Sequence, residues 1–249
     1  MQEYMNYEEY HLSMKEEAEC FGMAVVLTGI AAWVLYQSFW GCFLILIVFP
    51  LCRIYYREEK KEKQKQVLLL EFKEAMQSVA ASLLSGYSIE NAWKEAEKEL
   101  RELYGEEGLM TEEMRRMNSA ILMNQPIEQI LYQFALRTSC EDILEFAEVF
   151  RFAKRSGGNF GKIIQNTVFH IGEKIETERE IQTMIAGRRI EQRIMNVVPV
   201  GLLAYLNVTS KEFLRPLYGN LFGVCVMSVA FLAYLGALML ARKMTQIKI

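Results

Sequence analysis

The sequence predicts an all-α integral membrane protein, with a cytoplasmic six-helix bundle between N-terminal and C-terminal transmembrane helices. Three observations predict this class: three long uncharged runs, a highly charged middle region, and apolar residues that recur in that region at helical spacing. The chain has 249 residues and a net charge of −3, and no part of it carries the dominant basic field of a protein that binds nucleic acid.

The uncharged runs extend over residues 20–52, 194–210 and 216–241. A helix of about 20 apolar residues crosses a bilayer, and about 17 suffice. The first run is too long for one upright helix, and the residues Tyr36–Gly41 at its centre suit a turn at the membrane surface. We therefore favour a hairpin of two short helices, roughly 20–36 and 40–54, with one steeply tilted helix as the alternative.

Positive charge near the ends of the runs predicts the side of the membrane on which each segment lies. Lysine and arginine gather after the first run, before the second and after the third, whereas the link at 211–215 holds only Lys211 and Arg215. We therefore expect the middle region and the C-terminus in the cytoplasm, beneath the cell membrane. A hairpin at the start also places the N-terminus inside, a step that the single Lys15 supports weakly.

We divide the chain into five parts. They are an acidic N-terminal segment at 1–19, a transmembrane block at 20–54, a basic cytoplasmic linker at 55–66, a cytoplasmic helical domain at 67–192, and two transmembrane helices with a short basic tail at 193–249. The helical domain contains one proline and no alternating apolar pattern of the strand type, so each of its elements is predicted to be a helix.

The first two helices of this domain are separated by a glycine turn. An apolar stripe from Leu68 to Leu83 marks the first helix, which ends at Gly86 as a C-terminal cap. Ser88 begins the second helix, which continues to about Tyr104.

Capping residues predict where the next three helices begin. Thr111 opens the third helix, which continues to about Met123, and Pro126 opens the fourth at its first helical position. Ser139, with Asp142 three residues later, resembles a capping box and starts the fifth.

A glycine-rich run, KRSGGNFGK at residues 154–162, joins the fifth helix to the sixth. It differs from a phosphate-binding loop because it lacks one residue of the G-x-x-x-x-G-K-[ST] spacing, follows a helix, and has isoleucine after its last lysine. We therefore predict a structural turn, in which Gly157 and Gly158 end the fifth helix and Asn159 caps the sixth. The sixth helix can continue into the uncharged run that starts at Ile194.

The sequence contains no recognisable catalytic, cofactor-binding or metal-binding constellation. His11 and His170 lie far apart, and the five cysteines form no CxxC pair. The uncharged runs lack the charged side chains that mark an ion or proton path. We expect neither an enzyme nor a bound cofactor.

Two stretches carry a resemblance to a known family. Residues 72–100, FKEAMQSVAASLLSGYSIENAWKEAEKEL, contain a turn with Gly86, Ser88 and Ala92. Residues 150–200 contain a basic helix, the SGG motif, and a charged helix that leads into a proline-bearing run. This order resembles the type II secretion system F domain over roughly residues 65–245. With a single F domain, the chain is similar to the inner-membrane platform proteins of Tad (tight adherence) pilus systems, of the TadB or the TadC type.

The resemblance implies a non-catalytic platform beneath a growing pilus, which contacts a cytosolic ATPase and helps to extract pilin subunits from the lipid bilayer. It also implies pairing with a paralogous F-domain platform protein or with a second copy. As the ATPase contact we choose the basic cluster, defined as Arg151, Lys154 and Arg155, although charged helix ends are commonly just solvated. A membrane channel, transporter or receptor subunit with a helical cytoplasmic domain is the alternative function.

Overall fold

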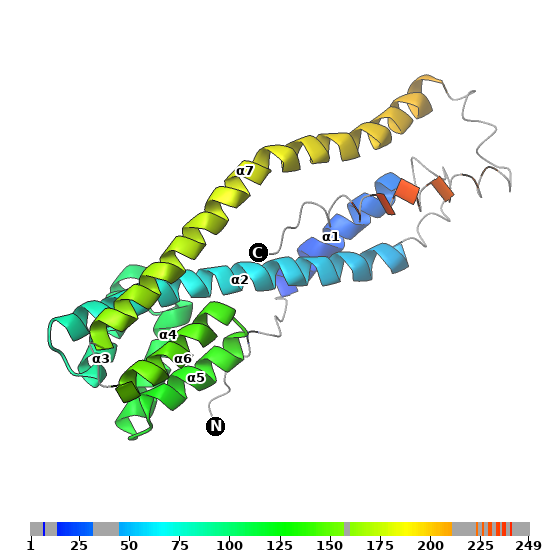
Figure 1. Cartoon of the computed structure of the whole chain (residues 1–249). Helices are drawn as coiled ribbons and strands as arrows, with labels where there is room; N and C mark the ends of the chain where they lie inside the picture. Colours follow the sequence, from blue (N-terminus) through cyan, green and yellow to red (C-terminus); the bar gives the residue numbers. More distant parts are fainter. Residues whose placement is uncertain are drawn as a thin grey trace. The chain divides into compact units, whose positions relative to one another are not determined.

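The computed structural model describes Tyr7, residues 14–31, 45–156 and 160–210, and scattered positions between 223 and 240. Within these residues all regular secondary structure is α-helical, as the sequence predicts. The helices are α1 (Met14–Ala31), α2 (Ile45–Leu84), α3 (Ile89–Tyr104), α4 (Leu109–Leu122), α5 (Ile127–Thr138), α6 (Glu141–Ser156) and α7 (Phe160–Thr209), labelled as in Figure 1. None of the helices that these residues form is both long enough and apolar enough to cross a membrane.

Several predicted features lie outside the described residues. They are the turn at Tyr36–Gly41, the link at 211–215, most of the third uncharged run, and the turn residues Gly157, Gly158 and Asn159.

The chain divides into two compact units. The head unit comprises residues 1–11 and 57–177, and the tail unit comprises residues 12–56 and 178–249. Helices α3 to α6 belong to the head unit and α1 to the tail unit, while α2 and α7 contribute residues to both. The predicted basic linker at 55–66 is helical and forms the middle of α2.

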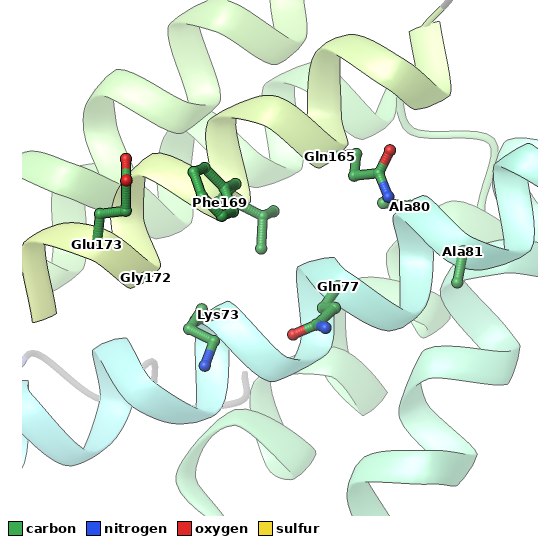
Figure 2. Close-up of a pocket in the computed structure, with 9 residues that line it drawn as sticks. Lys73, Gln77, Ala80, Ala81, Gln165, Phe169, Gly172 and Glu173 are labelled. Atoms are coloured by element: carbon green, nitrogen blue, oxygen red, sulfur yellow. The ribbon is translucent and has the colours of Figure 1, made fainter. Parts of the chain in front are cut away.

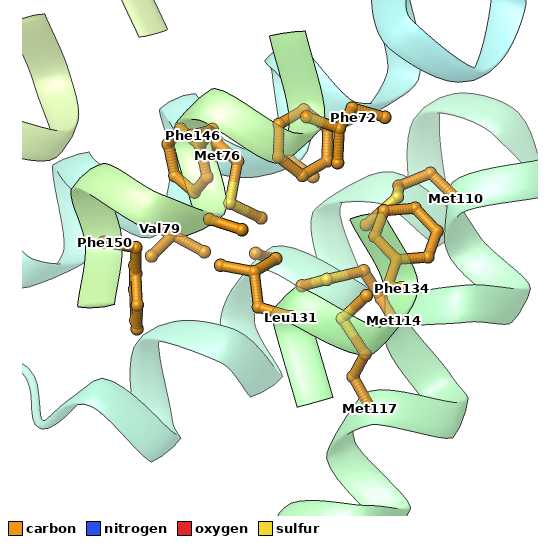
Figure 3. Packing of buried hydrophobic residues seen from close by; sticks show 14 of the residues in the cluster. Phe72, Met76, Val79, Met110, Met114, Met117, Leu131, Phe134, Phe146 and Phe150 are labelled. Carbon is orange, nitrogen blue, oxygen red and sulfur yellow. The ribbon is translucent and has the colours of Figure 1, made fainter. Parts of the chain in front are cut away.

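The head unit is built around an apolar core to which each helix from α2 to α7 contributes. Figure 3 shows core side chains from α2, α4, α5 and α6. The stripe on α2 from Leu68 to Val79 is buried, as its spacing predicts. Phe72 meets Phe146 edge-on, with ring centroids 5.1 Å apart, and Trp93 meets Phe150 in the same way at 5.5 Å. Such aromatic pairs add about 0.5–1.5 kcal/mol each beyond the burial of their area. Around this core α3 packs on α4, α4 on α5, and α5 on α6.

The turn between α2 and α3 follows the predicted pattern. Gly86 has a φ of 89°, in the left-handed region that glycine adopts without steric cost. Ser88 is the N-cap of α3, and its hydroxyl oxygen accepts a hydrogen bond from the backbone amide of Asn91 at 3.3 Å. This short, capped turn sets the direction in which α3 leaves α2.

The predicted start of α4 is wrong. The helix begins at Leu109 with Gly108 as its N-cap, and Thr111 is fully buried within it. Thr111 is not needed as a cap because Glu71, a side chain from α2, accepts a hydrogen bond from a backbone amide in the first turn. A cap supplied by a distant helix leaves no signal in the local sequence.

The predicted start of α6 is also wrong. Ser139 is the left-handed C-cap of α5, with φ 48° and ψ 35°, and α6 begins at Glu141. Lys65 on α2 donates a hydrogen bond from its Nζ to the carbonyl oxygen of Ser139 at 3.0 Å, which places a cation at the negative end of α5. Pro126 is the N-cap of α5 and so stands one residue before its predicted position.

In the tail unit α1 lies antiparallel to the first part of α2. Arg53 donates a hydrogen bond to Glu17 at 2.6 Å, and the rings of Phe49 and Phe21 meet with centroids 5.6 Å apart. Position 17 on α1 thus meets position 53 on α2, and position 21 meets position 49, so the two helices run in opposite directions. The hairpin interpretation of the first block also has two antiparallel helices, but at roughly 20–36 and 40–54, whereas α1 is Met14–Ala31 and α2 begins at Ile45.

Candidate functional site

Two members of the basic cluster have partners on α5. The Nζ of Lys154 lies 2.6 Å from a carboxylate oxygen of Glu128, and the guanidinium group of Arg151 lies 5.4 Å from the centroid of the Tyr132 ring. Arg155 is exposed in the last turn of α6. The cluster therefore also fastens the end of α6 to the start of α5, and Arg155 is the member best placed for an outside partner.

The ion pair of this cluster is modest in strength. The hydrogen bond from Lys154 holds the pKa of Glu128 below its ordinary value, against the opposing effect of partial burial. Both side chains are partly exposed, at 35% for Lys154 and 28% for Glu128, so solvent screens the pair and limits it to about 1 kcal/mol. A partner protein that bound Lys154 would therefore have to break only this weak ion pair.

A buried, ion-paired carboxylate lies inside the head unit. Glu113 on α4 is 1% exposed, and Arg137 on α5 donates hydrogen bonds to its two carboxylate oxygens at 2.8 and 3.3 Å. Arg116 lies 3.4 Å from the same carboxylate. Because burying a charge is costly unless it is paired and hydrogen-bonded, these guanidinium groups are what makes glutamate tolerable at this position.

Tyr7, from the N-terminal segment, reaches this carboxylate. Its side chain is 3% exposed and belongs to the apolar core of the head unit, and its hydroxyl donates a long hydrogen bond of 3.4 Å to Oε1 of Glu113. Burial, together with the negative charge of Glu113, raises the pKa of Tyr7 far above its ordinary value. The hydroxyl therefore remains protonated at physiological pH and acts as the donor.

A groove of about 450 Å³ lies between α2 and α7 within the head unit. Figure 2 shows Lys73 and Gln77 on α2 on one side of it, and Phe169 and Glu173 on α7 on the other. Lys73 pairs with Glu74 at 2.9 Å, and His170 lies 3.2 Å from Glu173, so both rims hold charges that have partners on their own helix. Such a groove has room for a few side chains of another polypeptide.

Two buried carboxylates among the described residues, Glu71 and Glu113, are not among the sites predicted from the sequence, although a signal for them exists. Each follows an apolar stripe residue by three positions and directly precedes the next, in the series Leu68–Glu71–Phe72 and Met110–Glu113–Met114. A carboxylate at a core position of a helical stripe requires a partner from elsewhere in the fold. No sequence pattern, however, identifies Arg137 as that partner.

The described residues contain no group of three His, Cys, Asp or Glu side chains close enough to hold a metal ion. Cys20, Cys52 and Cys140 are free thiols, and burial raises the pKa of Cys140, which disfavours its reactive thiolate.

Comparison with protein-family models, with curated proteins and with solved structures gives no significant match. The resemblance to the F domain therefore rests on the two sequence stretches quoted above, and the function that it implies is a proposal.

Proposed function

We propose that the chain is an inner-membrane platform protein of a Tad or type IV-like pilus, or of a type II-like secretion machine, of the TadB or the TadC type. It couples a cytosolic assembly ATPase to the extraction and polymerisation of pilin subunits and has no catalytic activity of its own. Its central helical domain lies in the cytoplasm, and its partners are the ATPase, a paralogous F-domain protein or a second copy, and the pilin.

The continuity of α7 is the observation that carries this proposal. The first part of this helix contributes Ile164, Val168 and Ile171 to the core of the head unit. The same helix continues to Thr209, with Pro199 inside it, and so includes most of the uncharged run that begins at Ile194. A platform that passes force from a cytosolic motor to the membrane requires a connection of this kind between the two.

The exposed surface of the uncharged run supports the membrane location. Large apolar side chains in the last part of α7 are more than half exposed, among them Met195 at 69%, Val197 at 67% and Val208 at 68%. Contiguous exposed apolar surface of this kind marks a site that lipid or another protein covers. Basic residues before the run, Arg188 and Arg193, suit the cytoplasmic face.

Deletion of the gene followed by complementation tests the role. Pili or secretion should be lost on deletion and restored by the intact chain, and the chain should remain in the membrane fraction after a carbonate wash. The purified chain should not hydrolyse ATP. ATP hydrolysis by the purified chain, or labelling of the head unit from outside intact cells, would exclude the proposal.

Charge reversal tests the ATPase contact. Arg155→Glu should weaken co-purification with the ATPase and reduce piliation, because this arginine is exposed and its reversal leaves the Lys154–Glu128 pair in place. Lys98→Glu on α3, at an exposed lysine that pairs with Glu95, is the matched control and should change neither readout. If the combined reversal of Arg151, Lys154 and Arg155 also left both readouts unchanged, the contact would lie elsewhere.

A further inference from the structure

The contact between Tyr7 and Glu113 joins two buried polar groups from distant parts of the sequence. One is the hydroxyl of an aromatic residue near the start of the chain, and the other is a carboxylate held within the bundle by Arg137. We propose that the head unit contains a docking site for a tyrosine side chain, built by α4 and α5 around Glu113, and that Tyr7 of the same chain occupies it as an intramolecular ligand. This inference does not depend on the proposed platform function.

The chemistry of the site selects a neutral phenol. The ring contributes to the apolar core cluster, so a much smaller or a polar side chain would lose most of that apolar burial. At the polar end the acceptor is the Glu113 carboxylate, which takes a hydrogen bond from an O–H group. Arg137 and Arg116 also contact that carboxylate, so it has ion-pair partners besides the tyrosine.

The ring contributes more to the docking than the hydroxyl. The hydrogen bond of 3.4 Å is longer than the usual 2.7–2.8 Å of a strong O–H···O contact, whereas the side chain is 97% removed from solvent, being 3% exposed. Buried aromatic anchors of this kind dominate the affinity of peptide docking. Loss of the ring should therefore release the segment, while loss of the hydroxyl alone should only weaken it.

The connection of Tyr7 to the rest of the chain raises its effective concentration at the site. Tyr7 belongs to the head unit, whereas α1, which begins only seven residues later at Met14, belongs to the tail unit. The N-terminal segment is therefore a covalently tethered ligand, and short tethers give effective concentrations of the order of millimolar. A free peptide would bind measurably only after the tethered tyrosine has been removed.

A labelled peptide of residues 1–13 tests the site on the full-length chain in detergent. The peptide should bind the Tyr7→Ala chain at least about tenfold more tightly than the intact chain, because the tethered ligand no longer competes. A peptide with Tyr7→Ala should bind at least about tenfold more weakly than the natural peptide, and one with Tyr7→Phe only a few-fold more weakly. Equal binding of the natural and Tyr7→Ala peptides, or equal binding to both chains, would overturn the proposal.

Photo-crosslinking keeps the test valid if the Tyr7→Ala chain fails to fold. Tyr7→p-benzoylphenylalanine in the otherwise intact chain should crosslink to tryptic peptides that contain residues of α4 or α5. The same replacement at Phe169 on α7, which is 62% exposed, is the control and should not reach those peptides. Crosslinks only to other regions would overturn the site. In a mixture of two differently tagged chains, crosslinks predominantly between chains would overturn the assignment of the occupant to the same chain.

Discussion

The carboxylate of Glu71, on α2, accepts a hydrogen bond of 2.7 Å from the backbone amide of Met110, in the first turn of α4. The first amides of a helix lack partners within it, and a negative charge at this end also interacts favourably with the helix dipole. Glu71 is 5% exposed, so this cap is formed in the interior of the head unit. One side chain thereby fixes the position of α4 against α2 across a separation of 39 residues.

Replacing Glu71 should destabilise the head unit. Hydrogen bonds to charged groups contribute about 1.5–3 kcal/mol, so Glu71→Ala is expected to cost about 2 kcal/mol or more and to leave the Met110 amide buried without its acceptor. Glu71→Gln retains an oxygen acceptor and should cost about half as much. Thermal unfolding of the full chain measures both, and Glu74→Ala, at a more exposed site, is the control. Equal effects of the three substitutions would contradict the capping role.

The Lys154–Glu128 pair should make a pH-dependent contribution to stability. Because the folded pKa of Glu128 is lowered, mainly by the hydrogen bond from Lys154, the contribution is present above the unfolded carboxyl pKa of about 4.3 and is lost as the pH falls through the folded value. Lys154→Gln should therefore lower stability by about 0.5–1 kcal/mol at neutral pH, after allowance for solvent screening. Near pH 2–3 the variant and the natural chain should unfold alike. A difference that persisted unchanged at acid pH would exclude the ion pair as its cause.

The N-cap of α4 should tolerate no side chain larger than that of glycine. A Cβ at Gly108 would lie 2.7 Å from Oγ1 of Thr111 and 2.9 Å from Cβ of Tyr104, so Gly108→Ala is expected to destabilise the head unit by about 1–3 kcal/mol. Gly172→Ala on α7 is the matched control, because the nearest atom to its Cβ would be Cδ of Lys73 at 3.8 Å. Because alanine has a higher helix propensity than glycine, Gly172→Ala should instead raise stability by about 0.5–1 kcal/mol. In chemical denaturation, Gly108→Ala should lower the free energy of unfolding and Gly172→Ala should raise it.

Removal of the strongest partner of Glu113 should be among the most damaging single changes. Arg137→Leu leaves a buried carboxylate with only the longer contacts to Arg116 and Tyr7, and breaking a buried pair in this way costs about 3–5 kcal/mol. Adding Glu113→Leu should recover part of that loss, because the uncompensated charge is then removed as well. Unfolding measurements on the two single variants and the double variant complete the cycle. Strict additivity would show that the two side chains do not interact.

The pairing of α1 with α2 should bring two native cysteines together. Cys20 stands next to Glu19, which accepts a hydrogen bond from Tyr56 at 3.2 Å, and Cys52 stands next to Arg53, the partner of Glu17. Mild oxidation should therefore join Cys20 to Cys52 in a chain that carries Cys42→Ser. Mass spectrometry of the tryptic peptide that contains both residues detects the bond.

A control separates this pairing from the single tilted helix considered for the first block. In one continuous helix the two cysteines would lie about 48 Å apart, at 1.5 Å per residue, and no bond could form. A chain with Cys20→Ser and Cys42 restored should give little crosslinking of Cys52. Absence of the Cys20–Cys52 bond, with both thiols shown to react with a small alkylating agent, would contradict the antiparallel arrangement.

Part of the candidate site could be predicted from the sequence. The exposed end of the fifth predicted helix, with Lys154 and Arg155, is recognisable because charge accumulates there beside a helix-breaking run. Its pairing with Glu128 could not be foreseen, since a lysine carries no local sign of which distant carboxylate it will meet. The same limit applies to the docking of Tyr7, because the 106 positions that separate it from Glu113 erase any periodic relationship.

The amino-acid sequence by itself determined the all-helical class, the turn at Gly86 and Ser88, and the buried stripe on α2, because helix periodicity and capping are properties of neighbouring residues. Only the tertiary structure decided that Glu71 caps α4, that Ser139 ends α5 instead of starting α6, and that Arg137 and Tyr7 meet at Glu113. Those choices depend on which side chains the packed helices bring within hydrogen-bond distance. Burial then makes each of these contacts obligatory, since a polar group removed from water is costly unless a partner replaces it.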